Sequence, residues 1–296
     1  MGAVLVTGAS KGIGRATALH LDLLGHTVLA GVRRQVDGDD LLEASTGRLV
    51  PVLLDVTDPE AIDRAVQAVS EVAPEGLAGL VNNAGLAVPG PLEFLPIDEL
   101  RHQLEVNVIG QVAMTRAALP LIRQASGRVV NVGSIGGRVA APFMGAYTAS
   151  KFALRALTDS LRLELRPWDI EVVLIEPGAV ATPIWSTAFA AGQELRRQLG
   201  PELEARYGRA LDALGARAVA NARAGMPPER VAEVIAVALT TAKPRPRYLV
   251  GRDARVVAVV ERLPDRLRDR VVAGRARRRP AEPRPAPASK AGSAQA

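Results

Sequence analysis

The chain has 296 residues, of which 48% are hydrophobic and 23% charged, a composition typical of a globular protein with a sizeable core. It contains no cysteine, which excludes disulfides and thiol catalysis, and its three scattered histidines lack metal-ligand spacing, so we predict no metal site. Six basic residues and one acidic residue lie from Arg275 onward, so this tail carries +5 of the net charge of +6 and, with only 3% aromatic residues, we expect no nucleic-acid partner.

The N-terminal stretch indicates a strand at 3–7, a glycine-rich turn and a helix from about 15 to 24. Gly8, Gly12 and Gly14 form the pattern G-x-x-x-G-x-G. Such glycines allow a sharp turn and let a pyrophosphate approach the helix N-terminus, where free N–H groups favour anions. Tight packing alone is the alternative, but the position directly after a strand favours dinucleotide binding.

The second expected strand, 27–31, indicates which dinucleotide binds. It runs into Val32, Arg33 and Arg34, with no acidic residue before Asp37. A carboxylate here would bind the ribose 2′-hydroxyl of NAD, whereas an arginine accommodates the 2′-phosphate of NADP. Arg33 together with Lys11 is suited to a dianion, so we predict NADP(H), with ordinary solvated arginines as the alternative.

Further strands are expected at 49–54, 80–81, 129–132, 170–175 and 247–250, separated by helices at 59–73, 97–123, 144–165 and 229–241. This alternation predicts the α/β class, with a doubly wound, Rossmann-like parallel sheet in a single domain over residues 1–250. Ligands bind beyond the carboxyl ends of such strands. Asp55, Asn83, Ser134 and the segment 177–182 all follow strands there.

A proton-transfer group is predicted after the strand at 129–132. Tyr147 and Lys151 lie one helical turn apart, and an ammonium beside a phenol lowers the phenol's pKa from its ordinary value of about 10. Ser134 could orient a carbonyl or alcohol oxygen opposite this face. Asn107 lies in an apolar turn of a helix, and we expect it to be buried. A surface Tyr–Lys pair is the alternative explanation.

These motifs together resemble those of the classical short-chain dehydrogenases/reductases. Residues 7–14 match T-G-x-x-x-G-x-G, residues 82–85 match N-N-A-G, and Tyr147 and Lys151 match Y-x-x-x-K. Ser134 lies 13 residues before Tyr147 and Asn107 a further 27 before Ser134, as in the family pattern. The resemblance covers roughly residues 2–250. Gly133 departs from it, because many members carry a second serine there, and we expect this to alter the substrate pocket.

The resemblance implies a role for each of these residues. Tyr147 would be the general acid/base, Lys151 would lower its pKa and hold the nicotinamide ribose, Ser134 would position the substrate oxygen, and Asn107 would hold a water in a proton relay. Asn82 is expected to link strands rather than to bind the cofactor. The residues expected to bind NADP(H) are Gly8, Ser10, Lys11, Ile13, Gly14, Arg33, Asp55 (near the adenine), Val56, Asn83, Ala84, Gly85, Tyr147, Lys151, Pro177, Gly178, Val180 and Thr182.

The substrate class follows from two segments. Residues 176–185 and 134–138 are similar to those of members that act on retinoids, hydroxysteroids or other lipophilic alcohols. The expected substrate-lining residues are therefore apolar, with lid or core packing as the alternative: Val139, Phe143, Ile184, Trp185 and Phe189. Residues 183–226 are interpreted as a helical substrate lid. The predicted function is NADP(H)-dependent interconversion of a carbonyl and a primary or secondary alcohol, with a non-catalytic NADP-sensing or scaffold protein as the alternative.

The C-terminal part is expected to form an amphipathic helix at 251–274 and a disordered, basic Pro/Ala tail at 275–296. Weak attachment to a membrane surface through this cationic end is one hypothesis, and a solvated tail is the other. The resemblance implies a homodimer or homotetramer through the helices at 97–123 and 143–166. No apolar run approaches the roughly 20 residues that span a bilayer, and no signal-peptide cleavage site is visible, so we expect a cytoplasmic protein.

Overall fold

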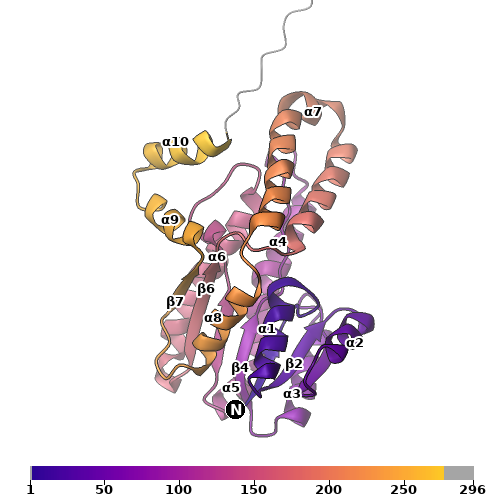
Figure 1. Ribbon diagram of the computed structural model, residues 1–296, viewed down its shortest axis with the longest axis vertical. Coiled ribbons are helices and arrows are strands. Elements are labelled where there is room, and N and C mark those ends of the chain that lie inside the picture. Colours follow the sequence, from indigo (N-terminus) through magenta and orange to yellow (C-terminus); the bar gives the residue numbers. More distant parts are fainter. Residues whose placement is uncertain (1, 277–296) are drawn as a thin grey trace, which may run out of the picture.

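A seven-stranded parallel sheet forms the centre of the protein, in a computed structural model that describes residues 2–276 (Figure 1). Its order, β3-β2-β1-β4-β5-β6-β7, places β1 and β4 side by side where the winding reverses, which confirms the predicted doubly wound, Rossmann-like α/β fold. The strands are β1 (Ala3–Val6), β2 (Thr27–Val32), β3 (Leu49–Leu53), β4 (Leu77–Asn82), β5 (Arg128–Val132), β6 (Glu171–Pro177) and β7 (Arg247–Val250).

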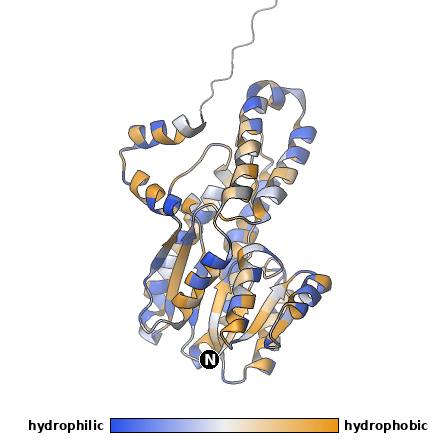
Figure 2. Cartoon of the chain, in the orientation of Figure 1, coloured by the Kyte–Doolittle hydropathy of each residue, from blue (hydrophilic) through white to orange (hydrophobic). Residues whose placement is uncertain are grey.

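Helices cover both faces of this sheet. Along β1, Val4 and Val6 pack into one apolar cluster, and Ala3 and Leu5 pack into a second on the opposite face. This alternation is the two-residue period of a strand buried on both sides. Figure 2 shows the central strands as the most hydrophobic part of the chain. The covering helices are α1 (Gly12–Leu23), α2 (Gln35–Glu43), α3 (Pro59–Val72), α5 (Gly110–Gln124), α6 (Gly145–Leu165) and α8 (Glu229–Thr240).

The single helix expected at 97–123 is wrong in one respect, because the structure interrupts it. Helix α4 (Ile97–Leu104) is followed by a π-turn, η1 (Glu105–Ile109), and then by α5. A π-turn inserts one extra residue into the helix, and such turns are frequent at functional sites. Apolar periodicity does not reveal one inserted residue. The insertion coincides with Asn107, the helical asparagine selected from the sequence.

The segment interpreted as a lid is the long helix α7 (Ile184–Ala224). The helix breaks at Gly200 (φ 77°, ψ −165°), which Pro201 follows, so α7 forms a two-armed hairpin that projects beyond the sheet (Figure 1). Arg196 joins the two arms, with its guanidinium 2.5 Å from the Glu204 carboxylate and 2.6 Å from that of Asp212. Ion pairs therefore hold the hairpin across its turn.

The C-terminal segment contains two helices where the sequence indicated one. Helix α9 (Arg252–Val260) and helix α10 (Asp265–Ala276) are separated by a turn that contains Pro264. The expectation of one amphipathic helix over 251–274 is therefore wrong, because proline interrupts helical hydrogen bonding. The expected disordered tail is corrected at 275–276, which belong to α10, and its remainder, 277–296, lies outside the described residues. None of the described helices is long and apolar enough to cross a membrane.

Candidate active site

The turn between β1 and α1 is shaped to receive an anion. Gly8 and Gly12 have φ values of 65° and 59°, a left-handed conformation that glycine adopts without a steric cost. Lys11 precedes α1, where no side chain caps the first N–H groups and no acidic residue lies in the first turn. These N–H groups and the helix dipole fit the pyrophosphate of a dinucleotide.

The segment Asn83–Gly85 lies directly against this turn. A Cβ atom added to Gly8 would lie 2.8 Å from Cα of Ala84, and one added to Gly14 would lie 2.4 Å from Nδ2 of Asn83. The Asn83 side chain donates hydrogen bonds to the carbonyl oxygens of Thr7 (2.9 Å) and Gly8 (3.1 Å). The predicted glycine and N-N-A-G motifs are thus brought together into one narrow cradle that side chains would fill.

Two unpaired cations lie along this edge, Lys11 just before α1 and Arg33 just after β2. Lys11 and Arg33 are exposed, and within residues 2–276 neither forms an ion pair with a carboxylate. Arg34 instead pairs with Asp37 at 2.5 Å. The hydrogen bond from Arg34 lowers the pKa of Asp37, as do the nearby charges of Lys11 and Arg33. Both cations therefore lie near enough to Asp37 to act on its carboxylate, at the edge where a 2′-phosphate would bind.

The other predicted cofactor residues lie along the same edge of the sheet. Burial opposes the charge of Asp55, but hydrogen bonds from Thr57 and the charge of Arg33 lower its pKa overall. Val56 is buried, and its carbonyl oxygen would lie 2.6 Å from a Cβ added to Gly110. The rest lie in the glycine turn and the first turn of α1, at the end of β6 and in the loop after it: Ser10, Ile13, Pro177, Gly178, Val180 and Thr182.

The loop after β6 is held by residues that the sequence motifs did not reveal. The Gly178 amide donates to the Val250 carbonyl at 2.9 Å, and the Ala179 amide donates to the Asp253 carboxylate at 2.7 Å. Asp253 lies in α9, 74 residues farther along the chain. No local pattern links these positions, so only the fold shows that α9 supports this loop.

Tyr147, Lys151 and Ser134 meet at the carboxyl end of β5. Tyr147 and Lys151 lie one turn apart in α6 and are only 8% and 5% exposed. The Lys151 Nζ atom lies 6.0 Å from the centre of the Tyr147 ring and donates to the Val132 carbonyl at 2.9 Å. Ser134 precedes the short helix η2 (Ile135–Gly137), and its hydroxyl is hydrogen-bonded to Tyr147.

Burial dominates the protonation of this pair. It raises the pKa of Tyr147 above its ordinary value, against a smaller lowering by the Ser134 hydrogen bond. It lowers the pKa of Lys151 to about 8. The pKa of Tyr147 is therefore raised, not lowered as expected, because the cost of burying the charged phenolate exceeds the lowering by its neighbours. At neutral pH Tyr147 carries a proton that it can donate.

Asn107 is fully buried, as predicted, and its side chain connects two parts of the site. Its amide accepts a hydrogen bond from the Leu86 N–H (2.9 Å) and donates to the Leu86 carbonyl (3.0 Å) and to Ser150 Oγ (3.0 Å). Ser150 in turn donates to the Tyr147 carbonyl at 2.7 Å. Asn107 thus holds the loop at Leu86 and, through Ser150, helix α6, and the predicted water relay stays a prediction.

Asn82 joins neighbouring elements rather than facing the glycine turn. Its Nδ2 donates to Asn131 Oδ1 on β5 at 2.9 Å and to Thr115 Oγ1 on α5 at 2.8 Å. These buried hydrogen bonds agree with the strand-linking role that was expected from the sequence.

A cavity of about 460 Å³ lies beside Ser134 and Tyr147 and is lined mainly by apolar side chains. Four of the five predicted substrate-lining residues line it: Val139, Phe143, Trp185 and Phe189. Ile184 is not in the lining and packs against the cluster of Met144, Tyr147 and Ala188, so this one assignment is wrong. The described part of the chain thus contains a space suited to an apolar ligand next to the candidate acid/base.

Much of the cavity wall comes from helices that no motif identified. Val257 and Val260 of α9 belong to the apolar face that the sequence showed, but periodicity does not say what such a face contacts. The second arm of α7 belongs to the predicted lid 183–226, but none of its residues was among those expected to line the substrate, and no role in the wall was predicted for α10. These two elements contribute Leu203, Leu211, Leu214, Val271 and Val272.

Phe143, in the segment between η2 and α6, contacts the lid helix α7. It has a φ of 64°, which is strained for a bulky residue and typical of functional loops. Its ring meets Tyr207 of α7 edge to face, with centroids 5.9 Å apart. The Tyr207 hydroxyl donates to Glu93 at 2.6 Å, which fixes the second arm of α7 over the cavity.

Known proteins share this fold and these motifs. The family model described as short chain dehydrogenase matches residues 2–192. Retinol dehydrogenase 5 of Mus musculus is 38% identical over 277 residues, covering 91% of this chain and 87% of that protein. An NADPH-dependent 3-dehydrocapnine reductase of Ornithobacterium rhinotracheale is 35% identical over 274 residues, covering 90% and 94%.

A solved structure agrees with these relatives. The crystal structure of a short-chain dehydrogenase from Streptomyces avermitilis superposes with a TM-score of 0.72 at 33% identity, covering 87% of this chain and 90% of that one. The sheet order, the glycine turn and the Ser134–Tyr147–Lys151 arrangement are all present in a chain that the family model matches over most of its length. The chain therefore belongs to the short-chain dehydrogenase family of oxidoreductases.

Proposed function

We propose that this protein is an NADP(H)-dependent oxidoreductase that interconverts a carbonyl and a primary or secondary alcohol on a lipophilic, retinoid- or steroid-like substrate. The observation that carries the proposal is the apolar cavity of about 460 Å³ beside the Ser134 and Tyr147 hydroxyls. This volume lies within the range of pockets for small organic ligands. The similarity to retinol dehydrogenase 5 supports the substrate class.

The chemistry requires a proton to move at the substrate oxygen. A bound nicotinamide supplies or accepts the hydride. In the reductive direction Tyr147 donates its proton to the carbonyl oxygen, and in the oxidative direction it removes the hydroxyl proton. Ser134 donates a hydrogen bond to the same oxygen and orients it. Lys151, positively charged below a pH of about 8, stabilises the phenolate that forms when Tyr147 has given up its proton.

The preference for NADP(H) rests on Lys11 and Arg33. Their unpaired charges, just before α1 and just after β2, suit a 2′-phosphate, and an arginine directly after β2 accommodates it. The NADPH-dependent relative supports this preference. The Asp37 carboxylate accepts its hydrogen bonds from Arg34, and not from Lys11 or Arg33.

Titration with NADPH and NADH side by side tests the cofactor proposal. We expect NADPH to bind more tightly, and Arg33→Asp to remove that preference. A charge-assisted hydrogen bond contributes about 1.5–3 kcal/mol, equivalent to roughly a tenfold to hundredfold change in affinity. Arg64→Asp, an exposed arginine on α3, is the control and should leave both affinities unchanged. Equal binding of NADH by the wild type would contradict the assignment of Arg33 and Lys11.

Turnover separates the enzyme from a non-catalytic NADP sensor. Purified protein with NADPH should reduce at least one member of a panel of apolar aldehydes and ketones that includes all-trans-retinal. Tight NADPH binding without turnover on the whole panel would favour the sensor. Binding of neither dinucleotide would contradict both.

We also propose assembly as a homodimer or homotetramer through α4, α5 and α6. Ile109, Phe152 and Leu157 of this region are each at least 40% exposed, an arrangement that buries apolar surface only if a second copy covers it. Light scattering should give a mass of at least twice 31.2 kDa. A monomer at micromolar concentration would contradict this proposal.

We further propose a cytoplasmic protein whose C-terminus attaches at most weakly to anionic membranes. Exposed Arg252, Arg255 and Arg262 flank the exposed Val256 and Val259, a combination that favours an anionic surface. Co-sedimentation with anionic vesicles should weaken when residues 275–296 are deleted. Equal sedimentation of both forms would contradict a contribution of residues 275–296 to membrane attachment.

A further inference from the structure

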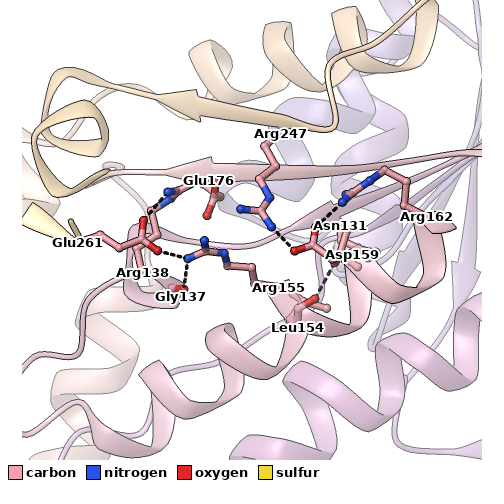
Figure 3. Close-up of polar contacts among 11 residues, drawn as sticks. Asn131, Gly137, Arg138, Leu154, Arg155, Asp159, Arg162, Glu176, Arg247 and Glu261 are labelled. Atoms are coloured by element: carbon pink, nitrogen blue, oxygen red, sulfur yellow. Dashed lines mark hydrogen bonds and ion pairs between the residues drawn. The ribbon is translucent and has the colours of Figure 1, made fainter. Parts of the chain in front are cut away.

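Four charged side chains form a closed cluster behind the candidate active site. Arg138 contacts Glu176 at 2.5 Å and Glu261 at 2.6 Å, and Arg155 contacts the other Glu261 oxygen at 2.5 Å (Figure 3). Arg138 and Glu176 are 10% and 1% exposed, and Arg155 and Glu261 are 21% and 25% exposed. The formal charges cancel, so the cluster is electrically balanced although it is largely withdrawn from water.

The cluster joins four elements that together frame the site. Arg138 directly follows η2 and lies four residues after Ser134, whereas Arg155 lies on α6 one turn after Lys151. Glu176 is in β6, just before the loop that Asp253 supports. Glu261 directly follows α9. Glu261 is therefore the point at which the C-terminal segment contacts the elements that carry the acid/base residues.

Helix η2 packs directly against Tyr147 and Lys151 of α6, so a shift of η2 would displace these two residues. A Cβ atom added to Gly136 would lie 3.0 Å from Cε1 of Tyr147, and one added to Gly137 would lie 2.7 Å from the Lys151 carbonyl oxygen. No space therefore separates η2 from α6. Arg155 also donates to the Gly137 carbonyl at 3.2 Å, which binds the two elements from the same guanidinium that holds Glu261.

The cluster is better suited to fixing geometry than to adding stability. Desolvation opposes the charge of Glu261, but the hydrogen bonds from Arg155 and Arg138 lower its pKa overall, so it is ionised at neutral pH. Buried ion pairs are often no more stabilising than apolar residues of the same shape. They do fix distance and direction, because a guanidinium and a carboxylate meet in few orientations. The bridged arrangement, with one arginine on each Glu261 oxygen, holds two elements at one separation.

Glu261 also places the wall of the cavity. Val257 and Val260 line the cavity from α9, and Glu261 is the next residue after that helix. Asp253 fixes the first turn of α9 to the Ala179 amide, so α9 is attached at both ends. Releasing the Glu261 end would leave the helix held at one end only.

We propose that Glu261 is a positioning residue, which through Arg138 and Arg155 sets the distance between Ser134 and the helix of Tyr147 and holds α9 against the bound substrate. The proposal rests on the proposed function for the identity of the site, but its central residue, Glu261, lies beyond the segment 2–192 that the family model matches. It predicts a defect in substrate binding and in kcat/KM without a corresponding defect in NADPH affinity.

The test compares three variants in two assays. Glu261→Gln keeps the shape and removes the charge, Glu261→Asp keeps the charge on a shorter side chain, and Asp265→Asn is the control, since that carboxylate is 81% exposed and is ion-paired with its helix neighbour Arg268. The first assay is NADPH-dependent turnover of all-trans-retinal. The second needs no turnover: retinal quenches Trp185, which lines the cavity and is the only tryptophan left in a Trp168→Phe background.

We expect Glu261→Gln to weaken retinal binding and lower kcat/KM by about tenfold to a hundredfold, as misplacement near 1 Å does, with the NADPH affinity unchanged. Glu261→Asp should recover part of the loss, and Asp265→Asn should match the wild type. Wild-type values for Glu261→Gln in both assays would overturn the proposal. If Glu261→Gln does not fold, as judged by circular dichroism, the Glu261→Asp variant decides in the same way, and wild-type binding by it overturns the proposal.

The failure of the proposed function would look different. In that case the wild type itself would show no turnover, whereas the Trp185 measurement would still report whether Glu261 holds α9 against an apolar ligand. Weakened quenching in Glu261→Gln alone would then support the positioning role in a protein that is not a retinal reductase.

Discussion

The cofactor half of the site is built from backbone turns, whereas the substrate half is built from side chains on distant helices. In the first, Gly8, Gly14 and Asn83 approach so closely that an added Cβ would clash, and the contacts involve main-chain atoms. In the second, α7 and α9 are held by ion pairs such as Arg138 with Glu261, and α7 also by aromatic contacts. Backbone geometry tolerates few residues, but charge pairs and apolar walls tolerate many. We therefore expect the cofactor half to tolerate few substitutions and the substrate half to tolerate many.

Substitution in the glycine turn should give the largest effect. A Cβ at Gly14 would lie 2.2 Å from the Gly8 carbonyl oxygen and 2.4 Å from Asn83 Nδ2, so Gly14→Ala forces the turn open. Overpacking of this kind costs about 1–3 kcal/mol, which is roughly a tenfold to hundredfold loss of NADPH affinity. Fluorescence titration measures it, with Gly274→Ala, where nothing lies within 4 Å, as the control. Equal NADPH binding by Gly14→Ala and the wild type would contradict the expectation that the cofactor half tolerates few substitutions.

Loosening the lid should give a smaller effect, confined to the substrate. Arg196→Gln removes the ion pairs to Glu204 and Asp212, which are 52% and 66% exposed and therefore contribute modestly. We expect KM for an apolar substrate to rise about threefold to fivefold, equivalent to about 0.7–1 kcal/mol. Arg197→Gln, whose arginine is 77% exposed and pairs only with its helix neighbour Glu194, should leave KM unchanged. A changed NADPH affinity in Arg196→Gln would show that the two halves are not independent.

A separate effect, on stability rather than on ligand binding, is a pH dependence that comes from the burial of Lys151. Burial lowers the pKa of Lys151 to about 8 from 10.5, so between these pH values the unfolded chain binds a proton that the folded chain does not. The stability of the wild type relative to Lys151→Met should therefore rise with pH from about 8 to 10 and stay flat below 8. Thermal unfolding followed by circular dichroism from pH 7 to 10 measures the difference. A difference that falls with pH above 8 would contradict burial as the cause.

The same division explains what could be predicted from the sequence. The order of strands and helices and the cofactor edge follow from local patterns: alternating apolar runs, glycines at fixed spacing, and polar residues at strand ends. Gly14 and Asn83 are 69 residues apart, yet each is recognisable on its own, because a backbone approach allows only certain residues. The burial of Asn107 could also be predicted, from its apolar neighbours in the sequence.

The substrate half was less predictable because its residues have no local signature. Asp253 and Glu261 look like ordinary carboxylates on a charged helix, and only the fold brings them to Ala179 and Arg138. The extra residue of the π-turn at Asn107 leaves the apolar period almost unchanged. The break at Pro264 does have a local signal, the proline itself, which apolar periodicity alone does not show. The direction of the Tyr147 pKa shift could not be predicted for the same reason. Helical spacing gives the distance of Tyr147 from Lys151 but not how deeply both side chains are buried.

Turnover by Tyr147→Phe tests the central claim most directly. The variant loses only the phenol hydroxyl, so the ring still packs against Gly136 and in the cluster with Met144 and Ala188. With NADPH and an apolar carbonyl that the wild type reduces, kcat should fall by about 10²–10⁴-fold, the usual contribution of a general acid. The NADPH affinity and the retinal quenching of Trp185 should stay within about twofold of the wild type. Turnover at the wild-type rate would contradict the assignment of Tyr147 and, with it, the proposed mechanism.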